Sequence, residues 1–479
     1  MVLAVLLSTT NLFADCPPEC TTCVSGMIVG ETWTEAGSPY CVEGDILVAG
    51  LIIEPGVRVE FLGDYVFEVA GILTVAGTKT EPVVFTRAET NEEGWQGIYF
   101  NYSAPGSQLA YAVIEGSINS GINIINSNPI IENCIIQNNT GTNGGGIYIS
   151  TTTEPAYELI IKNCKVRSNG SNSTIANGGG IHADIQTGLL KLTNCKIDSN
   201  TGYSYAWGAN CITKGGGIYA SGNIKLENCY IINNIVKAVT EHPNYWYDAC
   251  PRGGGIYFEG GELTMTNCII TNNTWVTGGY HYRSYPQGGG IYIETGTSNI
   301  VNCTVAYNDQ EGLRRGGGTV DIVNSIFWEN ILSEIAGTAT VTYSDVQDGY
   351  TGEGNINYNP IFDTCGPLQI VVGSQCIDAG NPDSQYNDVC FPPSLGTERN
   401  DMGAHGGPGA CGWPDDCPCD LNYDGKCDMQ DWLKFGEEWG HTDCNELGVE
   451  CECDLNGDGN CDMQDWLCFG EDWGRTDCP

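Results

Sequence analysis

The sequence predicts an all-β solenoid, in which short parallel strands stack coil upon coil, followed by a small α-helical pair encoded by a duplicated acidic segment. The word Gly-Gly-Gly recurs along the chain, beginning at residues 144, 178, 215, 253, 288 and 316. A second word ending in Asn-Cys recurs between these positions, from "IENCII" to "IVNCTV". Between the two words, short runs of alternating apolar and polar residues are bounded by Gly and Asn, a pattern typical of strands.

The composition excludes several classes of function. Lys and Arg number 19 against 59 Asp and Glu, so the net charge is −40. This charge repels nucleic acid and anionic membranes, which need basic residues to replace counterions. The 25 cysteines favour an oxidising compartment. The apolar segment 1–14 is typical of a secretory signal, and no other run is long enough to span a membrane. We expect a secreted protein, extracellular or cell-surface associated, without membrane insertion.

The repeats divide the chain into regions. We expect a cysteine-rich N-terminal cap over residues 15–41, the solenoid over 42–362, a closing segment over 363–410 and the C-terminal module over 411–479. A single strand cannot bury its apolar side alone, so equivalent coils must stack. Stacking predicts two interior columns, formed by Ile147, Ile181, Ile218, Ile256 and Ile291 and by Cys134, Cys164, Cys195, Cys229, Cys268 and Cys303. The Asn before each of these cysteines suits a tight left-handed bend, and the glycines allow close backbone approach.

This pattern resembles the right-handed, single-stranded parallel β-helix of the pectate-lyase-like superfamily, and its words look like polymorphic outer-membrane-protein repeats. The resemblance covers roughly residues 42–362, and "CIDAGNPDSQ" onward resembles the closing segment of such helices. The resemblance implies the fold and leaves the chemistry open, because lyases, hydrolases and adhesins share it.

Two further cysteines lie outside the column. Cys211 and Cys250 each precede a Gly-Gly-Gly word in adjacent coils. Stacking should bring them together, so we predict a disulfide between them.

A groove for carbohydrate is predicted on one edge of the solenoid. If the isoleucines point inward, the next residue in each coil points outward. The predicted outward column contains Tyr148, His182, Tyr219, Tyr257 and Tyr292, overhung by Trp207, Trp246 and Trp275 from variable loops. Aromatic rings stack on the apolar faces of sugars, so the column suits polysaccharide. The alternative is that the tyrosines only stabilise the sheet surface.

Catalysis is a weaker expectation for the same surface. Asp184, Glu259 and Glu294 lie two residues beyond the aromatic column. Adjacent coils would place Glu259 and Glu294 about 5 Å apart, near the spacing of a retaining glycosidase pair. His182 is a candidate acid or base. A column of acids on any parallel sheet has such spacings whether or not the acids are catalytic. The sequence therefore does not assign the catalytic residues.

The C-terminal module contains a 34-residue duplication, from "CDLNYDGKCDMQDW" to "CDLNGDGNCDMQDW". Each copy places oxygen-bearing side chains at loop positions 1, 3, 5, 9 and 12, with Gly at 6, as calcium loops require. Position 7 offers only a backbone carbonyl. The predicted ligands of two Ca²⁺ ions are Asp420, Asn422, Asp424, Lys426, Asp428 and Asp431, and Asp454, Asn456, Asp458, Asn460, Asp462 and Asp465.

Aspartate at position 12, the duplication and the C-terminal placement resemble a type I dockerin. This resemblance implies docking onto a cohesin-like protein through the helices at 432–439 and 466–473. Met429-Gln430 and Met463-Gln464 depart from the Ser/Thr pair that many dockerins carry there, and the nine cysteines of 417–478 are unusual for the family. We expect disulfides within the module, with the pairing open.

Taken together, these features predict a secreted protein that binds polysaccharide or another extracellular surface and is tethered through the calcium module. The alternatives are a polysaccharide hydrolase or lyase, and a structural adhesin.

Overall fold

The computed structural model describes residues 16–479 apart from 153–156, 243–245, 280–281, 364–367, 414–418, 422–425, 443, 445–450, 452, 456–459, 472 and 477–479. The predicted signal segment 1–14 therefore lies outside the described residues.

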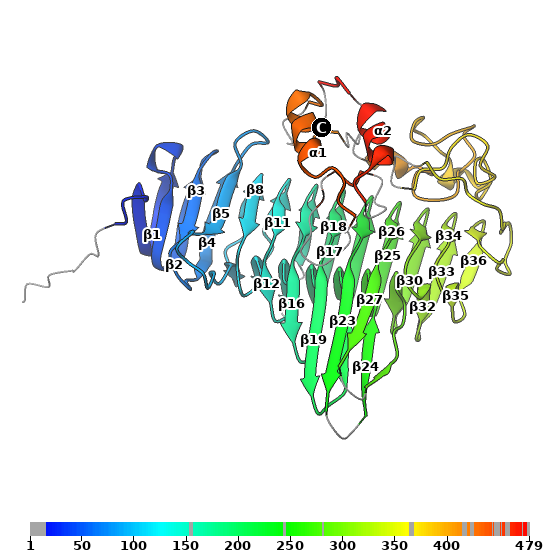
Figure 1. The fold of residues 1–479 in the computed structure, drawn as a ribbon, viewed down its shortest axis with the longest axis horizontal. Coiled ribbons are helices and arrows are strands. Elements are labelled where there is room, and N and C mark those ends of the chain that lie inside the picture. The colour runs from blue at the N-terminus through cyan, green and yellow to red at the C-terminus, as the bar shows by residue number, and fades with distance from the viewer. Residues whose placement is uncertain are drawn as a thin grey trace, which may run out of the picture.

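The chain forms a right-handed parallel β-helix with three faces, as the repeats predicted (Figure 1). On the first face, parallel pairing runs along the solenoid from β2 to β37. The strands of this face are β2 (Tyr40–Ile53), β3 (Arg58–Phe61), β5 (Val83–Arg87), β8 (Ala112–Glu115), β11 (Ile135–Gln137), β15 (Lys165–Arg167), β18 (Lys196–Asp198), β22 (Tyr230–Ile232), β26 (Ile269–Thr271), β31 (Thr304–Ala306), β34 (Ile326–Trp328) and β37 (Asp345–Val346).

The second face contains β6 (Ile98–Asn101), β9 (Ile122–Ile125), β13 (Ile147–Thr151), β29 (Ile291–Ile293), β32 (Glu311–Arg315) and β35 (Ser333–Ala336). The third contains β7 (Gln108–Ala110), β10 (Ile130–Glu132), β14 (Tyr157–Lys162), β30 (Thr297–Val301), β33 (Thr319–Val323) and β36 (Thr340–Thr342). Long strands bend from the second face into the third: β4 (Phe67–Ala76), β17 (Ile181–Thr193), β21 (Ile218–Glu227) and β25 (Ile256–Thr266).

The two predicted interior columns are confirmed. The isoleucine column and the six column cysteines are buried, and all six of those thiols are free. The asparagine before each cysteine has a positive φ, for example 53° at Asn194 and 51° at Asn228, as the bend requires. At Gly179 an added Cβ would lie 2.3 Å from the carbonyl oxygen of Gly216, so the Gly-Gly-Gly word is needed for close backbone approach.

A buried asparagine ladder runs along the corner after the first face, and the sequence analysis did not single it out. It contains Asn139, Asn169, Asn200, Asn234, Asn273, Asn308 and Asn330. Asn200 is typical: its Nδ2 donates to the Val166 carbonyl at 2.8 Å and to Asn234 Oδ1 at 3.0 Å. Its Oδ1 accepts the backbone N–H of Asn169 at 3.1 Å. Each coil is thereby bonded to both neighbours through a side chain.

The N-terminal cap consists of β1 (Thr22–Trp33), which pairs with β2 (Tyr40–Ile53). The 3-10 turn Glu35–Gly37 connects them. Disulfides Cys16–Cys23 and Cys20–Cys41 fasten its first residues to the first coil. The cysteine-rich segment at residues 16–41 therefore forms one end of the solenoid and is cross-linked there by two disulfides.

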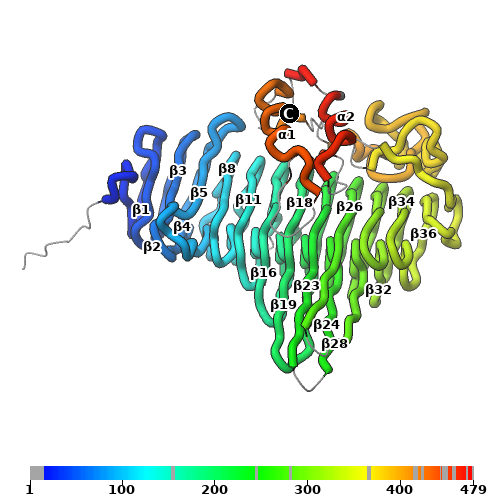
Figure 2. Tube along the Cα trace, viewed as in Figure 1, coloured from blue at the N-terminus to red at the C-terminus, as the bar shows by residue number. Residues whose placement is uncertain are grey.

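A two-layered projection, here called the fin, extends from the corner between the first and second faces (Figures 1 and 2). Its outgoing layer contains β12 (Thr140–Gly141), β16 (Gly170–Ser173), β19 (Thr201–Trp207), β23 (Ile235–Glu241) and β27 (Thr274–Gly278), and its returning layer contains β20 (Cys211–Lys214), β24 (Tyr247–Arg252) and β28 (Tyr282–Ser284). The expectation of loops here was wrong. Small buried residues, among them Ala206, Cys211, Ala238 and Ala249, let the two layers pack closely.

The closing segment turns back along the solenoid instead of ending it. Its backbone binds the amides of the bend asparagines: Asn302 Nδ2 donates to the Asp401 carbonyl at 2.9 Å, Asn267 Nδ2 to the Ala404 carbonyl at 2.7 Å and Asn228 Nδ2 to the Gly409 carbonyl at 3.0 Å. Turns Ser384–Tyr386 and Ala410–Gly412 and the disulfide Cys390–Cys411 shape this strap. It carries the chain from the far end back toward the middle, as Figure 2 shows.

The C-terminal module contains helices α1 (Met429–Glu437) and α2 (Met463–Glu471), placed on the opposite side of the solenoid from the fin (Figure 1). Each helix begins three residues earlier than predicted and ends before the last tryptophan of the predicted range. Neither is long or apolar enough to cross a membrane, nor is any other helix among the described residues.

Candidate functional sites

The predicted aromatic column exists, but most of it is buried. Ring centroids are 5.1 Å apart for Tyr148 and His182, 4.6 Å for His182 and Tyr219, 5.7 Å for Tyr219 and Tyr257, and 5.2 Å for Tyr257 and Tyr292. The last four side chains are 8%, 9%, 1% and 5% exposed. The expectation of an exposed row is therefore wrong, because the rings stack on one another and the returning strands of the fin end directly beside them. Only Tyr148 stays partly exposed.

Cations from the fin cover the tyrosine rings. Lys214, the last residue of β20, places Nζ 4.7 Å from the centre of the Tyr257 ring, and Arg252, the last residue of β24, lies 5.3 Å from the centre of Tyr292. Lys214 pairs with Glu259 at 3.2 Å and Arg252 with Glu294 at 3.2 Å. The column is thus the base of the fin rather than an open platform.

The candidate acids are bound into this base. Glu259 accepts from the Tyr219 hydroxyl, and Glu294 accepts from the Tyr257 hydroxyl at 2.8 Å. Partial burial raises the pKa of Glu259, but the Tyr219 hydrogen bond and the Lys214 charge outweigh it and lower the pKa overall. Burial, followed by the hydrogen bonds to these carboxylates, raises the pKa of Tyr219 and Tyr257. Each Tyr–Glu–cation group therefore joins neighbouring coils through a hydrogen bond and an ion pair.

Asp184 and His182 complete the set of candidate catalytic residues. Asp184 accepts from Ser221 Oγ at 3.2 Å and from Gln186 Nε2 at 3.2 Å. Burial lowers the pKa of His182 to about 4, so the imidazole is neutral at physiological pH. A register shift between Ala220 and Ser221 places Gly260 opposite Ser221, so Glu259 lies off the predicted row. The candidate acids thus lie along the base of the fin, each hydrogen-bonded to neighbouring residues rather than to another candidate acid.

The predicted Cys211–Cys250 disulfide does not form. Both thiols are free, with Cys211 buried between the layers of the fin and Cys250 partly exposed. The strand register pairs Cys211 with Ala249 and Ile212 with Cys250, a shift of one residue. Neighbouring residues of a strand point to opposite faces, so the two thiols lie on different sides of the returning layer.

Two strongly exposed tryptophans lie at the outer end of the fin. Trp207 and Trp246 are 66% and 61% exposed. Trp207 ends β19, which leaves the solenoid at Thr201, so a seven-residue strand carries its ring roughly 20 Å from the base. The ring lies 5.2 Å from His242 of the next coil, and His242 lies 5.7 Å from Tyr247. Trp207 and Trp246 therefore do not overhang the tyrosine column, and Trp275, near the start of β27, is only partly exposed.

The charged groups near this outer end are paired. Tyr205 donates to Glu241 at 3.3 Å, and Arg283 pairs with Asp248 at 2.9 Å. Lys237 lies 5.3 Å from the centre of the Tyr203 ring. The outer end of the fin thus offers aromatic faces and hydrogen-bonding groups in a locally balanced charge environment. The sequence analysis did not single out His242, although it lies in the same aromatic-rich segment as Trp246 and Tyr247.

The two module helices present a second apolar surface. Phe435 and Phe469 are buried with ring centroids 5.1 Å apart. Beside them, Trp432 and Trp466 are each 38% exposed. Two grooves of about 410 Å³ and about 350 Å³ flank this centre, lined by Trp432, Phe435, Gly436, Trp439, Met463 and Trp466 and by Met429, Trp432, Trp466, Phe469, Gly470 and Trp473. Each residue that lines one groove has its equivalent, 34 residues away in the duplication, in the lining of the other groove. The surface therefore has an internal two-fold relation.

The calcium ligands can be tested against the structure only in part, because Asn422, Asp424, Asn456 and Asp458 lie outside the described residues. Lys426 and Asn460, at position 7 of each loop, are exposed and partly exposed. At position 12, Asp431 and Asp465 are fully buried. Each accepts a backbone N–H at 2.8 Å, from Asp428 and Asp462 respectively. Buried carboxylates at the start of both helices fit a hard cation that prefers oxygen ligands.

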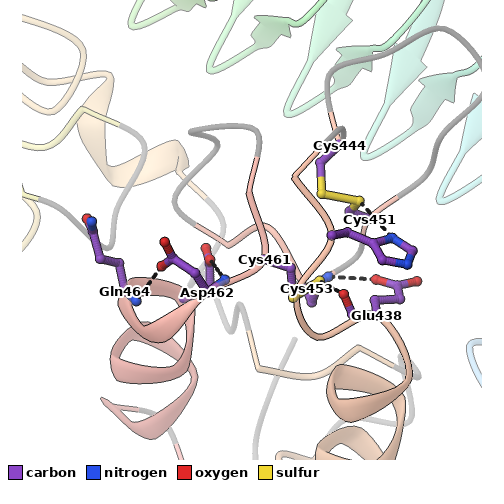
Figure 3. The surroundings of a disulfide bond; sticks show 9 residues. Glu438, Cys444, Cys451, Cys453, Cys461, Asp462 and Gln464 are labelled. Carbon is purple, nitrogen blue, oxygen red and sulfur yellow. Dashed lines mark hydrogen bonds between the residues drawn. A yellow bond between two sulfur atoms is a disulfide. The ribbon is translucent and has the colours of Figure 1, made fainter.

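Disulfides staple both loops. Cys419–Cys427 joins the residue before position 1 to the residue before position 9, and Cys453–Cys461 does the same in the second copy. Cys444–Cys451 lies between the copies, beside Glu438, whose carboxylate accepts the Cys453 N–H at 3.0 Å (Figure 3). The expectation of disulfides within the module is confirmed; Cys417 and Cys478 lie outside the described residues. Lys79 of the solenoid lies 3.6 Å from Asp420, at position 1 of the first loop.

Comparison with known families agrees with the solenoid. Residues 96–284 match a family model described as the right handed beta helix region. This match covers the coils that carry the fin and the tyrosine column up to Tyr257, and it ends before Tyr292. Comparisons with curated proteins and with solved structures found no match.

Proposed function

We propose that this protein is a secreted polysaccharide-binding β-helix, tethered to a cohesin-like protein through its calcium-dependent C-terminal module. The aromatic outer end of the fin supplies the glycan contact, and the paired helices supply the docking face. The proposal needs no catalytic step.

The exposure of Trp207 and Trp246 carries the glycan proposal. Large aromatic rings usually become buried, so two rings more than half exposed in neighbouring coils favour a stacking partner. Successive coils rise about 4.8 Å, and a linear glycan lying across the coils would meet one ring after another. The balanced charges around the rings favour a neutral sugar chain over an acidic one.

The duplicated apolar face supports the tether. Met429, Leu433, Met463 and Leu467 are each more than half exposed on short helices whose other side forms the module core. Short helices are marginal alone, so bound calcium would hold them in the packed arrangement. The grooves around Trp432 and Trp466 then receive apolar side chains of the partner.

The ion pairs and hydrogen bonds of the candidate acids disfavour a catalytic role. Glu259 and Glu294 each pair with a cation and a tyrosine, and Asp184 with a serine and a glutamine. A glycosidase pair needs one carboxyl group to protonate the leaving group and another to attack or to activate water. The carboxylates of Glu259 and Glu294 instead bind the lysine, arginine and tyrosine side chains at the base of the fin.

A glycan array with the full-length chain tests the proposal. Trp207→Ala with Trp246→Ala should lower binding at least tenfold, because each stacked ring contributes on the order of 1 kcal/mol. Ile331→Ala with Leu332→Ala is the matched control, since these side chains are 73% and 63% exposed on a later coil that carries no fin strand. Equal binding by both double variants would refute the fin as the contact. Release of reducing sugar by the wild type would instead establish the enzyme alternative.

A further inference from the structure

We propose that the N-terminal cap is a covalent attachment site for a thiol-bearing partner, which joins the exposed sulfur of Cys16 by thiol–disulfide exchange. A second exchange inside the cap then makes the attachment last. This inference concerns the end of the solenoid that neither the glycan contact nor the proposed tether uses, and it depends on neither of them.

Three sulfur atoms of the cap lie together. The Sγ atoms of Cys16, Cys20 and Cys23 are all within 4.8 Å of one another. They belong to two separate disulfides, Cys16–Cys23 and Cys20–Cys41, which therefore lie side by side. In the described part of the chain, no other three Cys, His, Asp or Glu side chains bring their ligand atoms so close. Metal ligation needs thiolates, and these sulfurs are oxidised, so the chemistry open to the group is exchange between disulfides.

The accessibility of the four cysteines gives the exchange a direction. Cys16 is exposed, whereas Cys41 is fully buried, and the other two are partly exposed. A thiolate in solution therefore reaches Cys16 most readily. A thiol buried in apolar surroundings stays protonated and inert, because the thiolate is the nucleophile. A free sulfur at Cys41 is thus the least reactive product of the four.

Two exchange steps connect these ends. In the first, the partner's thiolate attacks Cys16 Sγ, the bond to Cys23 breaks, and Cys23 leaves with the electron pair as a thiolate. In the second, this thiolate attacks the neighbouring Cys20 Sγ; the bond to Cys41 breaks, and Cys41 leaves and takes up a proton. Each step forms one disulfide and breaks one, so no oxidant or reductant is consumed. A mixed disulfide at Cys16 remains, beside a new Cys20–Cys23 disulfide.

The second step is what makes the attachment last. Without it, the freed Cys23 thiolate would return to Cys16, because a group held in a short loop acts at an effective concentration of about a millimolar or more. Cys20 and Cys23 have the Cys-X-X-Cys spacing of known exchange motifs. Loss of the bond to Cys41 leaves the pairing of β1 with β2 to hold the cap on the solenoid.

Charge selects the partner. The protein has a net charge of −40, and residues 16–41 contain Glu19, Glu31 and Glu35 but no Lys or Arg. This field attracts a thiolate carried on a cationic molecule or a basic surface and repels an anionic one. Cysteamine, a thiol with an ammonium group, is therefore the probe of choice, and glutathione, which is anionic, should react more slowly.

A peptide map after exposure to cysteamine tests the proposal. Full-length protein is incubated with about 0.1 mM cysteamine, well below the effective concentration of an internal thiolate, and is freed of excess probe by gel filtration. N-ethylmaleimide in denaturant then labels the free thiols before digestion without reduction. We expect cysteamine on Cys16, a Cys20–Cys23 disulfide and label on Cys41. Cys20→Ser with Cys41→Ser removes only the second disulfide and should retain at least about tenfold less cysteamine on Cys16.

The Cys390–Cys411 disulfide of the strap is the control within the same molecule. Cys411 is exposed and Cys390 partly exposed, but the pair belongs to no sulfur group among the described residues. It should therefore keep no cysteamine. Equal retention at Cys411 and Cys16, or in the double variant and the wild type, would overturn the proposal. A wild-type map with unlabelled Cys41 would overturn it as well, even if the double variant fails to fold.

Discussion

The buried asparagine ladder ends on a carboxylate. Asn330 donates its backbone N–H to Glu334 Oε1 at 3.2 Å and its side-chain amide to the other oxygen of the same group. Glu334 is 7% exposed and takes the place that the next asparagine would fill. Burial raises the pKa of Glu334 to about 7, and two hydrogen bonds from Asn330 only partly offset this rise. An ionisable group thus closes a neutral ladder.

Stability should therefore fall as pH rises from mildly acidic to neutral. Burial also raises the pKa of Asp345 and Asp401 to about 6 and that of Asp388 to about 7. In the unfolded chain such groups titrate near 4, so the folded state binds more protons between about pH 4 and 7. Their stabilising contribution is complete below about pH 4 and is lost through pH 7, by at most about 1.4 kcal/mol per pH unit per group.

Thermal denaturation between pH 4.5 and 8 measures this slope. Glu334→Gln keeps an acceptor and a donor but cannot ionise, so it should flatten the profile, whereas Glu262→Gln should not. A wild-type Tm that rises steadily over this range would contradict the pKa assignments.

Interrupting the ladder should be costly. Asn200→Ala leaves the buried backbone N–H of Asn169 without its partner and removes the hydrogen bond from Asn200 Nδ2 to the Val166 carbonyl. Each unsatisfied buried group costs about 1–3 kcal/mol, so we expect a loss of roughly 3 kcal/mol in the free energy of unfolding, measured by denaturant titration. Asn223→Ala, at an exposed position on β21, should change stability by less than about 0.5 kcal/mol. Similar values for the two variants would show that the ladder contributes little.

The tyrosine column should matter for stability and not for glycan binding. Tyr257→Ala removes a ring that is 1% exposed and stacked between Tyr219 and Tyr292. Truncation of a buried aromatic side chain costs about 3–5 kcal/mol. Trp246→Ala should leave the Tm nearly unchanged. The reverse pattern, with Tyr257→Ala stable and defective in binding, would restore the column as the contact surface.

The loop disulfides should act on calcium as well as on stability. Cys419→Ser with Cys427→Ser opens a short loop and should destabilise the module by about 2–3 kcal/mol. Cys444→Ser with Cys451→Ser opens a loop of similar length outside the calcium loops and is the matched control. Only the first pair should also weaken calcium binding, as titration would show. Equal calcium affinity in both variants would mean that the staple does not preorganise the loop.

Much of the solenoid could be predicted from the sequence, because the same residue type recurs at the equivalent position of each coil and has the same structural role there. The bend asparagines have left-handed backbone, and the column cysteines fill the core, as spacing predicted. The sixth Gly-Gly-Gly word is an exception. Leu313 of β32 pairs with Ile291, so Gly316 follows this strand instead of preceding it. Because this coil is shorter, its Gly-Gly-Gly motif lies after the second-face strand, whereas the earlier motifs lie before it.

The fin could not be predicted from apolar periodicity, because small residues form its interior. In β19 the inward residues are Gly202, Ser204 and Ala206, while the aromatic residues between them point outward. The sequence does alternate between small and aromatic residues in this strand. The small residues face inward and the aromatic residues face outward, which is the reverse of the usual strand pattern with large apolar residues inside. The same projection explains why the tyrosine column is buried and why Cys211 and Cys250 do not meet.

The two helices of the module were anticipated from the duplication, but the backbone hydrogen bonds that join its two halves were not. Backbone hydrogen bonds such as those between Cys427 and Gly474 depend on where each helix ends, and propensity does not set this end. The connectivity of the cysteines likewise follows from distances in the folded module, because several pairings are compatible with the same spacing.

The most direct test of the account is calcium stoichiometry in the full-length protein. Isothermal titration should find two ions per chain, and far-ultraviolet circular dichroism should lose helical signal on chelation. Asp420→Ala with Asp454→Ala should abolish uptake, while Glu158→Gln with Glu262→Gln, two exposed acids of the solenoid, should keep both ions. Two ions lost only from the loop variant would support the calcium-ordered tether. Uptake unchanged by the loop substitutions, or none in the wild type, would contradict it.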